Sequence, residues 1–289
     1  MTVEDQGRVR AEKFRKEHKL GHVPLPDLVS LIELTQQIDV AVLGADRDEH
    51  GLSMRDPVRG VVVVAVAQTP HPMRQRSTLA HELAHVLFGD FAPPKAGDWD
   101  ARSPEEVRAD AFARHLLVPL RGVEEVLAHG RTVETSDEVS VRDLSVLVQR
   151  FKASPSLVAI QLRQAGLIDD ARKSEWMKLS TRTLASRFGW SDLYAGWQQE
   201  ATTRRAPQRL LSRAIQGYVA NTVSLQAIAR LRGLPVERIA AELEAAGISP
   251  EPVEPVGPPP LPEDRPDTDF GDLDALDAEA ATTPGASDE

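Results

Sequence analysis

The sequence predicts an α+β fold that is mainly helical, with one small β-sheet and an all-helical carboxy-terminal region. Apolar residues recur at helical spacing along most of the 289-residue chain. Two short runs rich in β-branched residues, at 40–43 and 60–67, indicate strands. The stretch 251–289 is acidic and rich in proline, a composition that predicts a disordered tail.

The elements at the amino-terminal end follow from apolar spacing and from helix breakers. Residues 4–37 read as helical in two parts, which Gly21 and Pro24 separate. The strands at 40–43 and 60–67 come next, and we expect the small sheet that they form to border a functional cleft. Mostly helical segments follow.

The segment after the second strand carries the one arrangement in the chain that specifies a chemistry. His81, Glu82 and His85 form the pattern His-Glu-x-x-His within an apolar run. Residues four apart stand on one face of a helix, so both imidazoles can reach one tetrahedral zinc ion while Glu82 faces the water that completes its coordination. The spacing therefore predicts a zinc-dependent hydrolase.

The residues around this motif favour a helix. Either Ser77 or Thr78 can cap the first turn, and Gly89 can end the last. The apolar positions at helical spacing are Leu79, Leu83, Val86 and Leu87. The alternative is a buried amphipathic helix whose two histidines are only hydrogen-bonded, which the motif by itself leaves open.

A catalytic zinc ion needs a third protein ligand, and the best candidate lies on a second predicted helix. Ser103 is a candidate N-cap with Pro104 in the first helical position, and Pro119 marks the end. Glu106 and Asp110 are four residues apart and share one face of this helix. We expect Glu106 to bind zinc and Asp110 to accept the free N–H of a ligating imidazole.

Two other interpretations of this second helix remain open. Glu106 and Asp110 could lie on a solvated face and pair with Arg108 or Arg114. His115 is also of a metal-binding type, but it lies nine residues after Glu106 and so on the opposite side of the helix. We expect His115 to be a surface or packing residue.

These two motifs resemble the ImmA/IrrE family of bacterial metallo-endopeptidases. The first runs from Arg76 to His85. The second comprises Glu106, Ala109, Asp110, Phe112, Ala113, Leu116, Leu117 and Pro119. The segments 51–55 and 60–65 resemble the pair of strands that precedes the zinc helix in the family, and the resemblance spans about residues 25 to 165.

The resemblance implies a zincin-like metallopeptidase domain with Zn²⁺ as cofactor. Characterised members cleave helix-turn-helix transcriptional repressors, which relieves repression of a mobile element or a stress regulon. No part of this chain resembles the amino-terminal helix-turn-helix domain that some members carry, so the expected substrate is a separate repressor. Ser77 stands where many relatives have Phe, and Ala84 where many have Gly, but the expected ligands are intact.

The composition limits the location and the metal chemistry of the protein. No apolar stretch approaches the roughly 20 residues that span a bilayer, and the first residues lack the apolar core of a signal peptide, so we expect a cytoplasmic protein without membrane contact. The absence of cysteine excludes disulfides and thiolate ligands and leaves histidine and carboxylate as metal donors. Residues 251–289 hold twelve acids and one base, so the net charge of −10 resides in this tail.

The predicted domain organisation has three parts. They are a metallopeptidase domain at 1–170, a helical accessory or interaction domain at 171–250, and the tail at 251–289. A helix-turn-helix-like pair is expected at 139–168, with a role in substrate recognition or dimerisation favoured over DNA binding. The similar pair at 224–247 carries glutamates that repel phosphate, so we expect it to serve packing.

The expected mechanism assigns Glu82 as general base, which then delivers the proton to the leaving amine. No oxyanion-stabilising residue is identified, and Arg74, Arg76 and His71 are the nominal candidates. The alternative function is a non-proteolytic regulator that binds a repressor or DNA through its helical carboxy-terminal region. A third possibility is a housekeeping peptidase of broad specificity.

Overall fold

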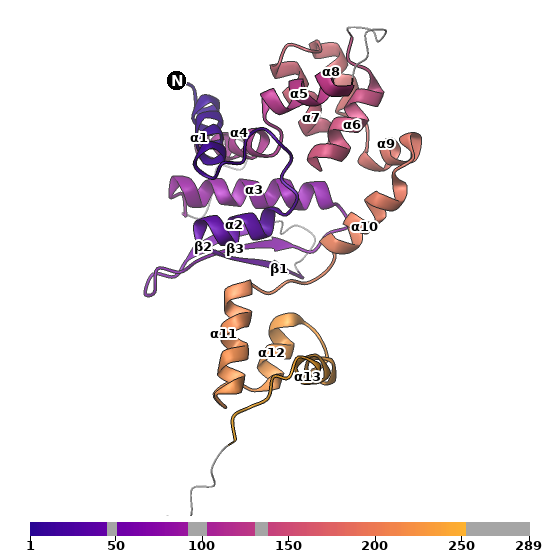
Figure 1. The fold of residues 1–289 in the computed structure, drawn as a ribbon. Coiled ribbons are helices and arrows are strands. Elements are labelled where there is room, and N and C mark those ends of the chain that lie inside the picture. The colour runs from indigo at the N-terminus through magenta and orange to yellow at the C-terminus, as the bar shows by residue number, and fades with distance from the viewer. Residues whose placement is uncertain (45–50, 92–102, 131–137, 253–289) are drawn as a thin grey trace, which may run out of the picture. The chain divides into compact units, whose positions relative to one another are not determined.

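The structure, a computed structural model, describes residues 1–44, 51–91, 103–130 and 138–252. It confirms the α+β fold class, with many helices and one three-stranded sheet (Figure 1). Residues Met1–Pro250 form one compact unit. The predicted acidic tail lies, from residue 253 onward, outside the described residues. No helix among the described residues is both long and apolar enough to cross a membrane.

Helix α1 (Val3–Glu17) packs along helix α4 (Pro104–Leu117), which carries the second motif. Gly7 permits this close approach, because a Cβ there would lie 2.4 Å from the backbone oxygen of Arg108. The side chain of Arg15 is buried beside the end of α4 and donates to the backbone oxygen of Leu116 at 2.9 Å. These contacts hold α4 against the rest of the fold.

The sheet has the strand order β1-β3-β2. Strand β1 (Asp39–Leu43) pairs in parallel with β3 (Val62–Ala67), in the register Asp39 to Val63. Strand β2 (Gly51–Arg55) pairs with β3 in antiparallel fashion, in the register Gly51 to Val66. Both predicted β-branched runs are therefore strands, although β3 begins two residues later than expected. Strand β2 lies at the edge and is mostly exposed.

Helix α3 (Pro72–Phe88) contains the His-Glu-x-x-His pattern and contacts both β2 and β3 as well as α4 and α2 (Leu28–Gln36). Figure 1 shows α3 running between the sheet and α4. Gly89 ends the helix at φ 78°, as predicted. The predicted cap at Ser77 or Thr78 is wrong, because Pro72 takes the first helical position and starts α3 nearly two turns earlier, with His71 at the N-cap.

Two buried clusters organise the helices that follow. One cluster runs from Ala11 to Tyr194 and includes the sheet, α3 and α4. The other lies within α11, α12 and α13, around Ile228 and Ile239. The remaining helices are α5 (Leu120–Gly130), α6 (Val141–Phe151), α7 (Pro155–Gln164), α8 (Asp170–Trp176), α9 (Thr181–Phe188), α10 (Ser191–Ala201), α11 (Gln208–Val219), α12 (Leu225–Arg232) and α13 (Val236–Ala245).

The segment after α10 connects back to the first strand. Arg205 and Val42 exchange backbone hydrogen bonds of 2.9 and 3.0 Å. The backbone N–H of Gln208 donates to the buried carboxylate of Glu33 at 3.0 Å, and Arg209 pairs with Asp39 at 2.9 Å. The predicted helix pairs correspond to α6 with α7 and to α12 with α13.

Candidate metal centre

The two histidines of the motif stand one turn apart on α3, with ring centroids 4.8 Å apart. Their Nε2 atoms are 3.0 Å from each other, and both side chains are largely buried. Four residues of helix advance bring the rings to the same face, which is why this spacing can place two nitrogen lone pairs at one point.

Glu106 reaches the same point from α4. Its Oε2 lies 3.1 Å from Nε2 of His81, and its Oε1 lies 3.4 Å from Nε2 of His85. Glu106 is in the first turn of α4, where the hydroxyl of Ser103 caps the helix by accepting from the backbone N–H of Glu106. The structure thus brings together the three residues that the sequence predicts as metal ligands.

The spacing of these donor atoms fits a tetrahedral zinc ion. With bonds of about 2.0–2.1 Å, two ligand atoms in a tetrahedron lie about 3.3 Å apart. The two Nε2 atoms here are 3.0 Å apart, and each lies 3.1 or 3.4 Å from one of the two oxygens of Glu106. Two imidazoles and one carboxylate are also the donor set of zinc sites that retain an open coordination position.

Asp110 orients one of the imidazoles. Its Oδ1 lies 3.0 Å from Nδ1 of His81, one turn along α4 from Glu106. A carboxylate at this distance holds the proton on Nδ1 and leaves the Nε2 lone pair directed at the metal position. Burial disfavours the charged imidazolium, but the hydrogen bond that His81 donates to Asp110 and the charge of Glu106 outweigh this effect and raise the pKa of His81.

His85 lacks a comparable partner. Its Nδ1 atom is buried and has no hydrogen bond with any residue that the structure describes. If Nδ1 carries the proton, the lone pair of Nε2 is free to bind a metal ion, as in His81. The Nδ1 atoms of the two candidate ligands are therefore supported differently, since that of His81 faces Asp110.

Glu82 points from α3 toward the edge strand. Its carboxylate is buried, and this desolvation raises its pKa, although a hydrogen bond with Ser53 of β2 opposes the shift. Gly51 allows β2 to approach, because a Cβ there would lie 2.5 Å from Cγ2 of Thr78 and 3.1 Å from Oε1 of Glu82. The sequence carried no signal for the contribution of Ser53, which depends on the pairing of β2 with β3.

The alternative partners of the two acids are occupied elsewhere. Arg108 pairs with Asp90 at 2.6 Å and lies over the ring of Phe88, at 4.2 Å from its centroid. Arg114 pairs with Glu4 of α1. Arg108 therefore joins the carboxy-terminal end of α3 to α4, which helps to set the distance between the two halves of the site.

The other sequence candidates lie away from the three ligands. Arg76 donates to the backbone oxygen of Leu25 at 2.6 Å, and His71 is an exposed N-cap residue. His115 is buried, and its Nδ1 lies 3.3 Å from Nε2 of Gln161. It is a packing residue, one of the two outcomes expected for it. No contact of Arg76 or His71 with the metal ligands occurs in the described part of the chain.

Comparison with known proteins identifies the domain that holds this site. Residues 36–163 match the peptidase M78 family model, described as the IrrE N-terminal-like domain. This domain belongs to the ImmA/IrrE family. The ImmA/IrrE domain includes all three candidate ligands, and membership indicates a metallopeptidase-type function. No curated protein matches the chain.

Proposed function

We propose that this chain is a zinc-dependent endopeptidase that cleaves a separate helix-turn-helix transcriptional repressor and so relieves repression of a mobile element or stress regulon. One observation carries the enzymatic part of this proposal. His81, His85 and Glu106 converge at separations suited to zinc, beside the buried carboxylate of Glu82. The substrate is inferred from what is known of the ImmA/IrrE family.

In the proposed enzyme His81, His85 and Glu106 hold the metal, and Asp110 keeps His81 in the required tautomer. When bound, zinc supplies a Lewis acid that polarises the scissile carbonyl and lowers the pKa of a coordinated water. Glu82 takes a proton from the attacking water and passes it to the departing amine. Its burial suits this role, because a carboxylate with a raised pKa is a better proton acceptor at neutral pH.

The edge strand offers a way to bind an extended substrate. Strand β2 pairs with β3 on one side only, and its residues are mostly exposed. It lies close to Glu82 through Gly51 and Ser53. A peptide that adds to this edge would form backbone hydrogen bonds beside the general base, which requires little side-chain identity. We therefore expect cleavage within an extended or locally unfolded segment of the repressor.

The test uses the purified chain with zinc and the repressor encoded beside its gene. Mass spectrometry should detect one cut in the repressor at substoichiometric enzyme. Glu82→Gln should retain zinc and lose cleavage, whereas Glu124→Gln, an exposed glutamate on α5, should cleave normally. Full activity of Glu82→Gln would contradict the role of Glu82.

The same experiment separates the alternative functions. A repressor that is bound but not cut, even with excess enzyme, would favour a non-proteolytic regulator. Degradation of casein would favour a housekeeping peptidase, since a repressor-specific enzyme should leave casein intact.

A further inference from the structure

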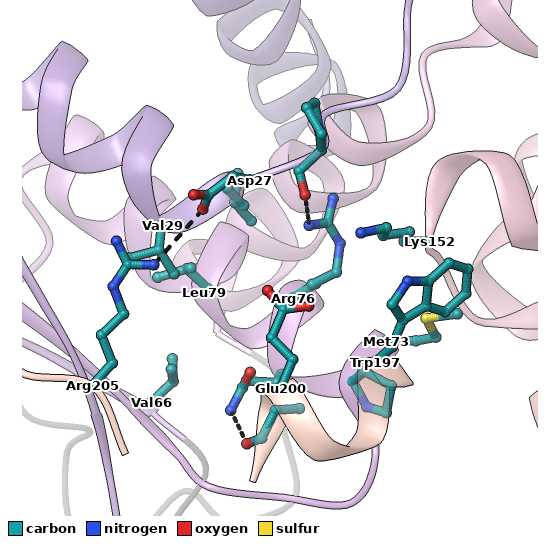
Figure 2. A pocket seen from close by; sticks show the side chains of 15 residues that line it. Asp27, Val29, Val66, Met73, Arg76, Leu79, Lys152, Trp197, Glu200 and Arg205 are labelled. Carbon is teal, nitrogen blue, oxygen red and sulfur yellow. Dashed lines mark hydrogen bonds and ion pairs between the residues drawn. The ribbon is translucent and has the colours of Figure 1, made fainter. Parts of the chain in front are cut away.

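A hollow lies beside the first half of α3, away from the candidate metal ligands. Five parts of the chain form it: the start of α2, strand β3, the first half of α3, the end of α6, and the end of α10 with the segment that follows it (Figure 2). It has a volume of about 70 Å³. None of the candidate metal ligands lines it.

The floor of this hollow is apolar. Val66, Met73 and Leu79 line it, and each is nearly fully buried. Trp197 contributes an aromatic wall from α10. Such a surface accepts a small apolar or aromatic body.

Two cationic side chains, Lys152 and Arg76, also line the hollow. The ammonium of Lys152 lies 5.1 Å from the centroid of the Trp197 ring, and it forms no ion pair with any described residue. Arg76 donates to the backbone oxygens of Leu25 and Pro26, while its buried Nε has no partner in the described part of the chain. Burial lowers the pKa of Arg76 to about 10, against the opposing charge of Glu200. Two cations therefore face the hollow without a paired carboxylate.

The balance of charge limits the ligand to a single negative charge. Arg76, Lys152 and Arg205 line the hollow together with two acids, Asp27 and Glu200. Arg205 is already paired with Glu33 at 3.5 Å and with Asp27 at 4.0 Å, which leaves Arg76 and Lys152 beside Glu200. One anionic charge balances these three groups, whereas a dianion such as phosphate would leave an excess of negative charge in a partly buried site.

We infer that this hollow binds a small monocarboxylate with an apolar body, whose charge is held by Lys152 and Arg76 and whose body lies against Trp197 and the apolar floor. This inference does not depend on the proposed peptidase activity, because neither zinc nor a substrate takes part in the binding. Since Arg76 and the metal-binding histidines share α3, an occupant would also contact the helix that carries the candidate metal centre.

The test is a titration of the full chain with benzoate, followed by saturation-transfer NMR. Benzyl alcohol, which lacks the charge, and inorganic phosphate, which lacks the apolar body, serve as comparison probes. We expect saturable binding of benzoate, and binding at least tenfold weaker for both comparison probes. Absence of saturable benzoate binding, or equal binding of benzyl alcohol, would overturn the inference.

A matched pair of variants locates the site. Lys152→Asn removes the ammonium and suits the left-handed backbone of this position, at φ 48°. It should weaken benzoate binding about tenfold, the loss expected for one charge-assisted contact. Lys178→Asn, at an exposed lysine outside the hollow, should leave binding unchanged. A second variant, Lys152→Gln, controls for the possibility that asparagine changes the end of α6. Unchanged affinity for benzoate in both Lys152 variants would also overturn the inference.

Discussion

The buried imidazole of His115 should make the stability of this protein fall as the pH drops below neutrality. His115 is 3 % exposed, and burial, together with the nearby charges of Arg114 and Arg8, lowers its pKa from 6.5 to about 4. The unfolded chain therefore binds this proton more tightly than the folded chain. The resulting loss of stability begins as the pH falls through 6.5 and is complete near pH 4.

The size of the effect follows from the two pKa values. Between pH 7.5 and pH 5 the free energy of unfolding should fall by about 2 kcal/mol through this one group. The assay is urea denaturation of the metal-free chain at both pH values, for the wild type and for His115→Asn. Asparagine can accept the hydrogen bond from Gln161 that Nδ1 of His115 accepts.

Comparing the two proteins cancels the contributions of every other titrating group, including His81, whose raised pKa acts in the opposite direction. The pH-dependent loss should be about 2 kcal/mol smaller in His115→Asn, even if asparagine lowers stability equally at both pH values. An identical pH dependence in the two proteins would refute the conclusion that His115 is buried in its neutral form.

Two further predictions concern the support of the metal centre. Asp110→Asn should weaken zinc affinity about 10–100-fold, because an amide orients His81 less firmly than a carboxylate. Chelator competition measures this affinity, and an unchanged value would show that Asp110 has no such role. Gly7→Ala should lower the free energy of unfolding by about 1–3 kcal/mol, because its Cβ would meet the backbone of Arg108, whereas Gly196→Ala, with open space around it, should not destabilise the chain. Equal urea midpoints for these two glycine variants would contradict the tight packing of α1 on α4.

The cluster of His81, His85 and Glu106 could be predicted from the sequence because its geometry is mostly local. His81 and His85 are separated by one helical turn, and Glu106 and Asp110 by another, so each pair is placed by helix periodicity alone. The sequence pattern does not show that α3 and α4 pack together so that the two pairs of residues meet. Gly7 and Arg108 make contacts that hold α4 in this position, and no motif around either residue predicts these contacts.

Other features depended on contacts that the sequence does not encode locally. Strand β2 contains Gly, Leu, Ser, Met and Arg and no β-branched residue, so its strand conformation comes from pairing with β3. The hydrogen bond between Ser53 and Glu82 depends on that pairing. The hollow at Arg76 and Lys152 unites five parts of the chain, and the fold places Arg76 there and not beside the metal ligands, where the sequence made it a nominal oxyanion candidate.

The binding of zinc by the full chain tests the central claim most directly. After equilibrium dialysis against zinc, elemental analysis should find one ion per chain in the wild type and in Glu124→Ala. Glu106→Ala should bind zinc at least tenfold more weakly, because it removes one of three protein ligands. A wild-type chain without zinc, or a Glu106→Ala variant that binds zinc as tightly as the wild type, would contradict the account.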